Sequence, residues 1–110
     1  MHKFATIETA ISVIQSGGMV VVIDDEGREN EGDIIASASL ITPQVINFMA
    51  KEGRGLICAP VSSEIAKKLN LDLMIDGGDK PDHGCNFTVS IDLKKGTSTG
   101  ISASDRAKTI

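Results

Sequence analysis

Carboxylate side chains are concentrated in one short stretch of the chain, IDDEGRENEGDII, at residues 23–35. Its single basic residue is Arg28, and its acidic residues are Asp24, Asp25, Glu26, Glu29, Glu31 and Asp33. Carboxylate oxygens suit a hard divalent ion such as Mg²⁺, which usually takes one or two of them and keeps several waters. The forked guanidinium of Arg28 suits a phosphate, a carboxylate or a hydroxyl-rich substrate. These residue types fit a metal and anion site, and a solvated acidic hairpin loop is the alternative.

The segments on either side of this stretch determine how its charges are placed. MVVVID (19–24) is a continuous apolar run typical of a strand buried on both faces, and DIIASASL (33–40) alternates as a second strand does. If the backbone between them is extended, Glu29, Glu31 and Asp33 point to one side. Carboxylates this close repel one another unless a positive charge lies between them. Active sites of open α/β sheets commonly lie at strand ends, which favours a site over a solvated loop.

The rest of the chain alternates between helix and strand patterns. Four segments open with a Thr or Ser that can cap a first helical turn, and they are residues 6–17, 42–53, 62–70 and 102–110. Further strands are expected at residues 55–61 and 85–93, with a loop of turn formers at 76–84. The element order α-β-β-α-β-α-β-α predicts a mixed α/β protein of the α+β class, with helices packed on one mixed, twisted sheet.

Length and composition restrict the classes of protein to which the chain can belong. Its 110 residues predict a single domain, 1–110, and 41% apolar with 24% charged residues is ordinary for a globular protein. The net charge of −4 argues against a nucleic-acid partner, and no apolar run of about 18 residues predicts a membrane span. Two cysteines without framework spacing and no signal-like start predict a cytoplasmic protein with reduced thiols.

Three segments resemble the 3,4-dihydroxy-2-butanone 4-phosphate synthase family of riboflavin biosynthesis. DDEGRENEGD (24–33) resembles the signature of that family, and GLICAPV (55–61) resembles its central strand. FTVSID…GTSTGISASDRAKTI (87–110) is similar to its next most recognisable stretch. The likeness runs in the same order along the whole chain. Ten near-consecutive residues with this charge pattern are a far more specific signal than an isolated glycine motif.

The resemblance implies a reaction and a set of site residues. Family members convert D-ribulose 5-phosphate to L-3,4-dihydroxy-2-butanone 4-phosphate and formate; they are homodimeric lyases with active sites near the subunit interface. Each complete site uses Mg²⁺ or Mn²⁺, as two ions. In the matching positions Arg28, Glu29 and Asp33 would bind substrate, Glu29 would bind metal, and Glu29, Glu31 and Asp33 would be catalytic. The weaker substrate-binding candidates are Asp24, Glu26, Cys58 and Thr99.

The same resemblance implies segments that this sequence lacks. Family members continue past the stretch that matches up to Ile110, with an Arg-x-Gly-His-Thr segment that grips the phosphate and supplies a metal-binding histidine, and with a further catalytic Glu. The last helix, capped by Ser102, runs to Ile110 without a C-cap. We therefore expect a truncation within the family's catalytic domain that is inactive by itself and exposes apolar faces. The alternative is a non-catalytic truncated homologue that binds a divalent metal or sugar phosphate, or that associates with full-length subunits.

Other residues have both a functional and a structural interpretation. Cys58 lies within an expected strand, where a small buried hydrophobe is the alternative to a pocket residue. Thr99 lies in GTSTGIS (96–102), whose hydroxyl and N–H groups fit either an anion site or ordinary turn-and-cap chemistry. Asp105 and Arg106 are expected to face solvent or a neighbouring helix and to serve in structural pairing.

Overall fold

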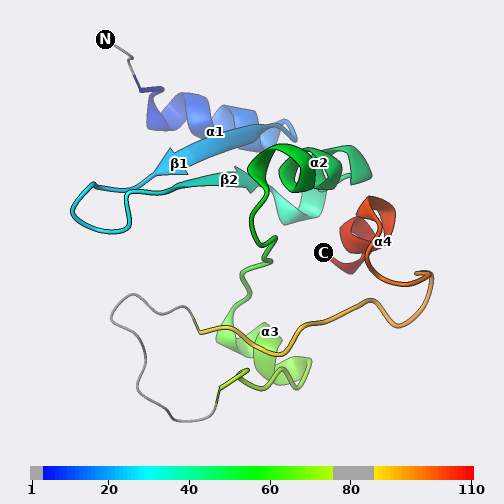
Figure 1. The fold of residues 1–110 in the computed structure, drawn as a ribbon. Coiled ribbons are helices and arrows are strands. Elements are labelled where there is room, and N and C mark those ends of the chain that lie inside the picture. The colour runs from blue at the N-terminus through cyan, green and yellow to red at the C-terminus, as the bar shows by residue number, and fades with distance from the viewer. Residues whose placement is uncertain (1–3, 76–85) are drawn as a thin grey trace.

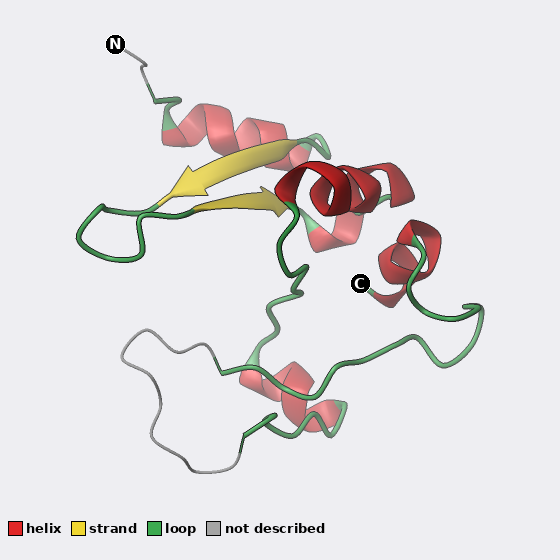
Figure 2. Cartoon of the chain, viewed as in Figure 1, coloured by secondary structure: helices red, strands yellow, loops and turns green. Residues whose placement is uncertain are grey.

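The computed structural model describes residues 4–75 and 86–110, and its fold is of the expected mixed α+β class. The predicted loop at 76–84, and the first residue of the predicted strand at 85–93, lie outside the described residues. The elements are α1 (Ile7–Gln15), β1 (Met19–Ile23), β2 (Gly32–Ala36), a 3₁₀ turn η1 (Ala38–Leu40), α2 (Pro43–Phe48), a π-helical turn η2 (Met49–Gly53), α3 (Ser63–Lys68) and α4 (Ala103–Thr109). Figure 1 shows their arrangement, and Figure 2 shows how much of the chain is loop.

The sheet of the described residues consists of β1 and β2 alone, paired antiparallel with Val21 opposite Ile34. Both were predicted as strands. The predicted strand at 55–61 is wrong for this structure, because no backbone hydrogen bond joins those residues to another described residue. The predicted strand at 85–93 is reduced to one bridge between Leu73 and Thr88. A strand forms only where a neighbouring strand accepts and donates its backbone hydrogen bonds. Residues 55–61 have no such neighbour among the described residues, and the second segment has one only at residues 72–74.

Each predicted helix is present and begins at its predicted cap. The side-chain oxygens of Thr6, Thr42, Ser62 and Ser102 accept hydrogen bonds from the backbone N–H three residues further along, at distances of 3.0–3.3 Å. Pro43 occupies the first helical position of α2, where its missing N–H costs nothing. Helix starts were predictable because capping needs only residues that are close in sequence.

The core of the described residues is small. Ile46 of α2 is fully buried, and α2 packs against α4, beside which the C-terminus lies (Figure 1). α1 contacts β1 and covers part of the sheet. Val21, in contrast, is 65% exposed, so the prediction that the first strand is buried on both faces is wrong here. The exposure of apolar faces expected from the sequence is observed, since Leu56 and Ile101 are also exposed. No helix in the described ranges is long and apolar enough to cross a membrane.

Candidate active site

The acidic loop, defined here as residues 24–31, joins β1 to β2 and is folded around the carboxylate of Asp24. One oxygen, Oδ1, accepts a hydrogen bond of 2.7 Å from the backbone N–H of Glu31. The other, Oδ2, accepts one of 3.0 Å from the N–H of Glu29 and one of 2.8 Å from Nη1 of Arg28. The backbone N–H of Asp24 in turn donates to the carbonyl of Glu31, at 3.2 Å. The Asp24 side chain therefore connects the start of the loop to its end.

A tight turn at the tip of this loop changes where Glu29 points. The N–H of Arg28 donates to the carbonyl of Asp25 at 2.9 Å, and the N–H of Gly27 donates to Oδ1 of Asp25 at 2.7 Å. Asn30 has a φ of 51°, in the left-handed region that Asn tolerates better than most residues. The strand begins only at Gly32. The expectation that Glu29 alternates with Asp33 along one extended strand is therefore wrong.

Arg28 lies within the acidic cluster and offsets part of its charge. Its guanidinium is 2.8 Å from Oδ2 of Asp24 and 3.4 Å from Oε1 of Glu29. The Arg28 side chain is 58% exposed, so these ion pairs are in contact with water and are weak individually. The hydrogen bond from Glu31, followed by those from Glu29 and Arg28, holds the pKa of Asp24 below its ordinary value. Asp24 is therefore ionised and well suited to organise the loop.

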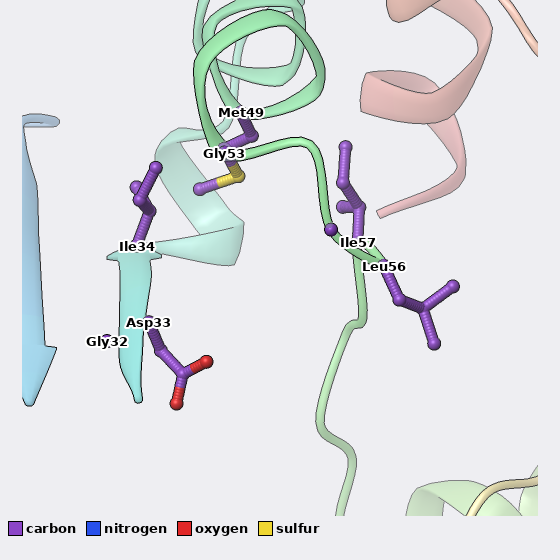
Figure 3. Close-up of a pocket in the computed structure, with 8 residues that line it drawn as sticks. Gly32, Asp33, Ile34, Met49, Gly53, Leu56 and Ile57 are labelled. Atoms are coloured by element: carbon purple, nitrogen blue, oxygen red, sulfur yellow. The ribbon is translucent and has the colours of Figure 1, made fainter. Parts of the chain in front are cut away.

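Asp33 is the site candidate that faces a pocket. The pocket has a volume of about 130 Å³ and is open to solvent. Its lining residues are Gly32, Asp33, Ile34, Met49, Gly53, Gly55, Leu56 and Ile57. Figure 3 shows the Asp33 carboxylate between the start of β2 and the segment that carries Leu56 and Ile57. Sites for small ligands usually exceed about 300 Å³, so this pocket matches part of a sugar phosphate rather than all of one.

The carboxylates of the loop match Mg²⁺ in chemistry but do not complete a site. Glu26, Glu31 and Asp33 are exposed, and the Glu29 side chain is 32% exposed, so their oxygens are accessible to a hydrated ion. Among the described residues, however, no three His, Cys, Asp or Glu side chains are grouped closely enough to hold a metal. Mg²⁺ commonly takes one or two protein carboxylates and completes its shell with water and substrate oxygens. The loop could thus supply one or two ligands of such a shell.

Thr99 and Cys58 are not brought to the acidic loop. Thr99 is exposed in the segment before α4, and Figure 1 shows this segment and the acidic loop on opposite sides of the molecule. Cys58 follows the pocket residue Ile57 and is an exposed free thiol, so the interpretation as a buried hydrophobe is wrong here. The structure therefore gathers five candidates in one loop, Asp24, Glu26, Arg28, Glu29 and Glu31. Asp33 lies at the base of this loop, and Cys58 and Thr99 lie in other segments.

Asp105 has a role that the sequence pattern did not reveal. It is 4% exposed, so the solvent-facing alternative is wrong, whereas the expected structural pairing is present as hydrogen bonds. Its Oδ2 accepts hydrogen bonds from the N–H of Ser98 at 2.9 Å, the hydroxyl of Ser98 at 2.7 Å and the N–H of Gly100 at 3.0 Å. The Ser98 hydroxyl is the main cause that lowers the pKa of Asp105 below its ordinary value. The sequence feature that could have indicated this role is the hydroxyl-rich segment 96–102, which directly precedes a helix capped by Ser102 and with Asp105 in its first turn.

Comparisons with known proteins identify the family of the chain. The family described as 3,4-dihydroxy-2-butanone 4-phosphate synthase matches residues 8–110. Riboflavin biosynthesis protein RibBA of Cytophaga hutchinsonii is 55% identical over 109 residues, which are 98% of this chain and 27% of that protein. RibBA of Aquifex aeolicus is 53% identical over 110 residues, with the same two coverages of 98% and 27%.

Solved structures extend the likeness to the fold. A 3,4-dihydroxy-2-butanone 4-phosphate synthase in complex with two magnesium ions has a TM-score of 0.88 and 42% identity, over 96% of this chain and 49% of that one. RibBX, a two-domain synthase from A. baumannii, has a TM-score of 0.83 and 46% identity, over 96% of this chain and 30% of that one. The chain thus spans about a quarter to a half of the length of these relatives. It belongs to the 3,4-dihydroxy-2-butanone 4-phosphate synthase family.

Proposed function

We propose that this chain forms part of a lyase that converts D-ribulose 5-phosphate to L-3,4-dihydroxy-2-butanone 4-phosphate and formate in riboflavin biosynthesis. The observation that carries the proposal is the acidic loop, folded on Asp24 within a chain of this family. The reaction is balanced without an oxidant, because the atoms of the five-carbon sugar phosphate are divided completely between the four-carbon phosphate and formate. The chain then needs to supply binding, metal ligation and proton transfer only.

The loop residues divide these tasks. Glu29 would hold the metal, Mg²⁺ or Mn²⁺ as two ions, and a relative solved with two magnesium ions supports this. When bound, a divalent ion stabilises negative charge on substrate oxygens after a proton leaves the carbon beside a ketone. Glu31 and Asp33 are exposed carboxylates that could accept and return protons. Arg28 would bind substrate while it offsets the charge of Asp24 and Glu29.

Asp33 and the pocket beside it would bind the sugar hydroxyls. The carboxylate accepts hydrogen bonds only, and a sugar chain offers several hydroxyl donors. The apolar residues Ile57 and Met49 line the same pocket as Asp33. Cys58 and Glu26 remain weaker candidates, since Cys58 follows the pocket directly and Glu26 lies in the acidic loop.

We also propose a cytoplasmic homodimer with its sites near the subunit interface. The segment before α4, which carries Thr99, and the acidic loop lie on opposite sides of one chain (Figure 1), so both can contact one small substrate only if two copies contribute. Exposed apolar side chains such as Val21 and Leu56 agree with further covering by protein. The net charge of −4 continues to argue against a nucleic-acid partner.

A second candidate is a non-catalytic protein that associates with full-length subunits of the family. Residues 55–61 favour it, because they are strand-like in sequence and have no backbone hydrogen bond to another described residue. Such a segment can pair with a strand from another polypeptide. The two candidates differ in whether the residues of this chain can take part in turnover.

A grafted enzyme separates the two candidates. The 110 residues of this chain would replace the 109 matched residues of the Cytophaga hutchinsonii RibBA, with which they are 55% identical. With D-ribulose 5-phosphate and Mg²⁺ as the only additions, we expect formate release, and we expect Glu29→Gln to lower it by at least about 100-fold. Glu64→Gln, on α3, is the matched control and should have no effect. A folded graft without formate release would favour the non-catalytic candidate.

A further inference from the structure

Asp105 connects both neighbours of Thr99 to a single oxygen atom. Its Oδ2 accepts the hydrogen bonds of Ser98 and Gly100, the residues immediately before and after Thr99. We propose that Asp105 is a positioning residue, which holds Thr99 so that its hydroxyl contacts an oxygen of the sugar-phosphate substrate. This inference rests on the proposed function for the identity of the substrate. The hydrogen bonds from Ser98 and Gly100 to Asp105, on either side of Thr99, are observed independently of it.

The hydrogen bonds of this segment leave one hydroxyl group available to a ligand. We call residues 96–100 the hydroxyl loop, because it contains Thr97, Ser98 and Thr99. The Thr97 hydroxyl donates to the carbonyl of Leu93 at 2.8 Å, and the Ser98 hydroxyl donates to Asp105 at 2.7 Å. Thr99 is exposed and makes no hydrogen bond to any described residue. Two hydroxyls thus hold the loop, and the third is presented to solvent.

The hydroxyl loop is held firmly at both ends, as a positioning role requires. Nζ of Lys108 donates to the carbonyl of Gly96 at 3.0 Å, which ties the start of the loop to α4. At the other end Gly100 has a φ of +85°, which side chains with a Cβ rarely adopt. A Cβ there would lie 2.5 Å from Oδ1 of Asp92. The backbone on either side of Thr99 is therefore restricted to one path.

Charge around the hydroxyl loop favours an anionic ligand. Residues 92–110 carry four basic side chains and two acidic ones. One of the two acids, Asp105, is buried and already accepts three hydrogen bonds. The basic side chains are Lys94, Lys95, Arg106 and Lys108. The excess of basic side chains attracts a phosphate ester, and it is partly offset by the exposed carboxylate of Asp92, which lies against Gly100.

Binding by the 110-residue protein tests the inference. D-ribulose 5-phosphate with Mg²⁺ would be titrated into ¹⁵N-labelled protein, and the amide signals of Ser98, Thr99 and Gly100 followed by NMR. We expect saturable shifts in the unmodified chain. Asp105→Asn should weaken the apparent Kd by about tenfold, as is common for groups that orient a ligand-binding residue. Asp72→Asn, an exposed site with the same change in charge, should bind as the unmodified chain does.

A double-mutant cycle distinguishes positioning from a purely structural role. If Asp105 acts through Thr99, Thr99→Val should weaken binding in the unmodified chain but add little in the Asp105→Asn background. Additive effects, or an unchanged Kd in Asp105→Asn, would overturn the inference. If Asp105→Asn does not fold, Ser98→Ala removes one of the three hydrogen bonds and should weaken binding about two- to fivefold; an unchanged Kd would overturn the inference equally.

The position of the shifts separates this inference from the proposed function. Shifts limited to residues 24–33, with the hydroxyl loop unaffected, would overturn the role of Thr99 and leave the proposed function intact. No shift at any residue of the unmodified chain would overturn substrate binding by this chain, and with it the role assigned to Thr99.

Discussion

Two loops of this protein are each held by one aspartate carboxylate that accepts several hydrogen bonds, and they expose different functional groups. In the acidic loop the carboxylate of Asp24 accepts hydrogen bonds from the N–H groups of Glu29 and Glu31. In the hydroxyl loop the buried carboxylate of Asp105 accepts them from Ser98 and Gly100. Both hydrogen-bond sets lower the pKa of the central aspartate. One ionised carboxylate is thus enough to order a short loop, and the residues carried on the loop decide what it can bind.

The two loops differ in what they leave exposed. The acidic loop presents carboxylates and one guanidinium, a set suited to a divalent cation and to hydroxyl groups. The hydroxyl loop presents Thr99 in a segment, residues 92–110, with four basic and two acidic side chains, a set suited to an anion. A metal-dependent enzyme that acts on a sugar phosphate needs both kinds of surface. The comparison therefore predicts that the loops serve opposite ends of one substrate, from two copies of the chain.

Among variants that test the comparison of the two loops, the largest expected effect follows from releasing the acidic loop. In the grafted enzyme Asp24→Asn replaces one acceptor oxygen by an NH₂ group, which then faces the N–H donor of either Glu31 or Glu29. We expect formate release to fall by about 10–100-fold, because Glu29 is no longer held in place. Asp72→Asn in the same graft is the control. Equal rates for the two variants would show that Asp24 does not organise the site.

A smaller effect comes from one glycine in each loop. Gly100→Ala should lower the free energy of unfolding by at least about 1–2 kcal/mol, because φ is +85° and Asp92 lies in the way. Gly27→Ala should change it by less than about 1 kcal/mol, since the new Cβ meets only Oδ1 of Asp25, at 3.1 Å, which belongs to a side chain. Urea unfolding of both variants measures the difference. Equal losses would mean that the hydroxyl loop is no more restricted than the acidic loop.

The smallest expected effect is on the pH dependence of stability. Because the folded pKa of Asp105 lies below its ordinary value of 3.8, its ionised form stabilises the fold above that pH. This stabilisation is lost as the pH falls from about 4 through the lower, folded pKa. Asp105→Asn should therefore flatten the acid limb of a plot of unfolding free energy against pH, and Asp72→Asn should not. An unchanged acid limb in Asp105→Asn would contradict the hydrogen-bond set around this carboxylate.

Local features of the fold were predicted well from the sequence. The caps at Thr6, Thr42, Ser62 and Ser102 all form, because each joins groups three residues apart. The strands β1 and β2 were also expected, from two apolar runs close together, and the structure pairs them as a hairpin. The strands predicted at 55–61 and 85–93 do not form, since an apolar pattern shows that a segment can be a strand but cannot supply its partner.

The candidate site was predictable by residue type and less so by geometry. The cluster of carboxylates around Arg28 is visible in the sequence, and the structure does gather it in one loop. Its organisation by Asp24 was not visible, because it depends on a left-handed residue at Asn30 that turns the chain back. The burial of Asp105 was missed for a similar reason: its donors come from a loop whose path no periodic pattern describes.

The most direct test of the account compares formate release by two proteins, the purified 110-residue chain and the grafted enzyme, under the same conditions. Each receives D-ribulose 5-phosphate and Mg²⁺, and formate is measured over time. We predict release by the graft and none by the chain alone, because the acidic loop supplies only part of the metal and substrate ligands. Formate release by the 110-residue chain alone would contradict the account.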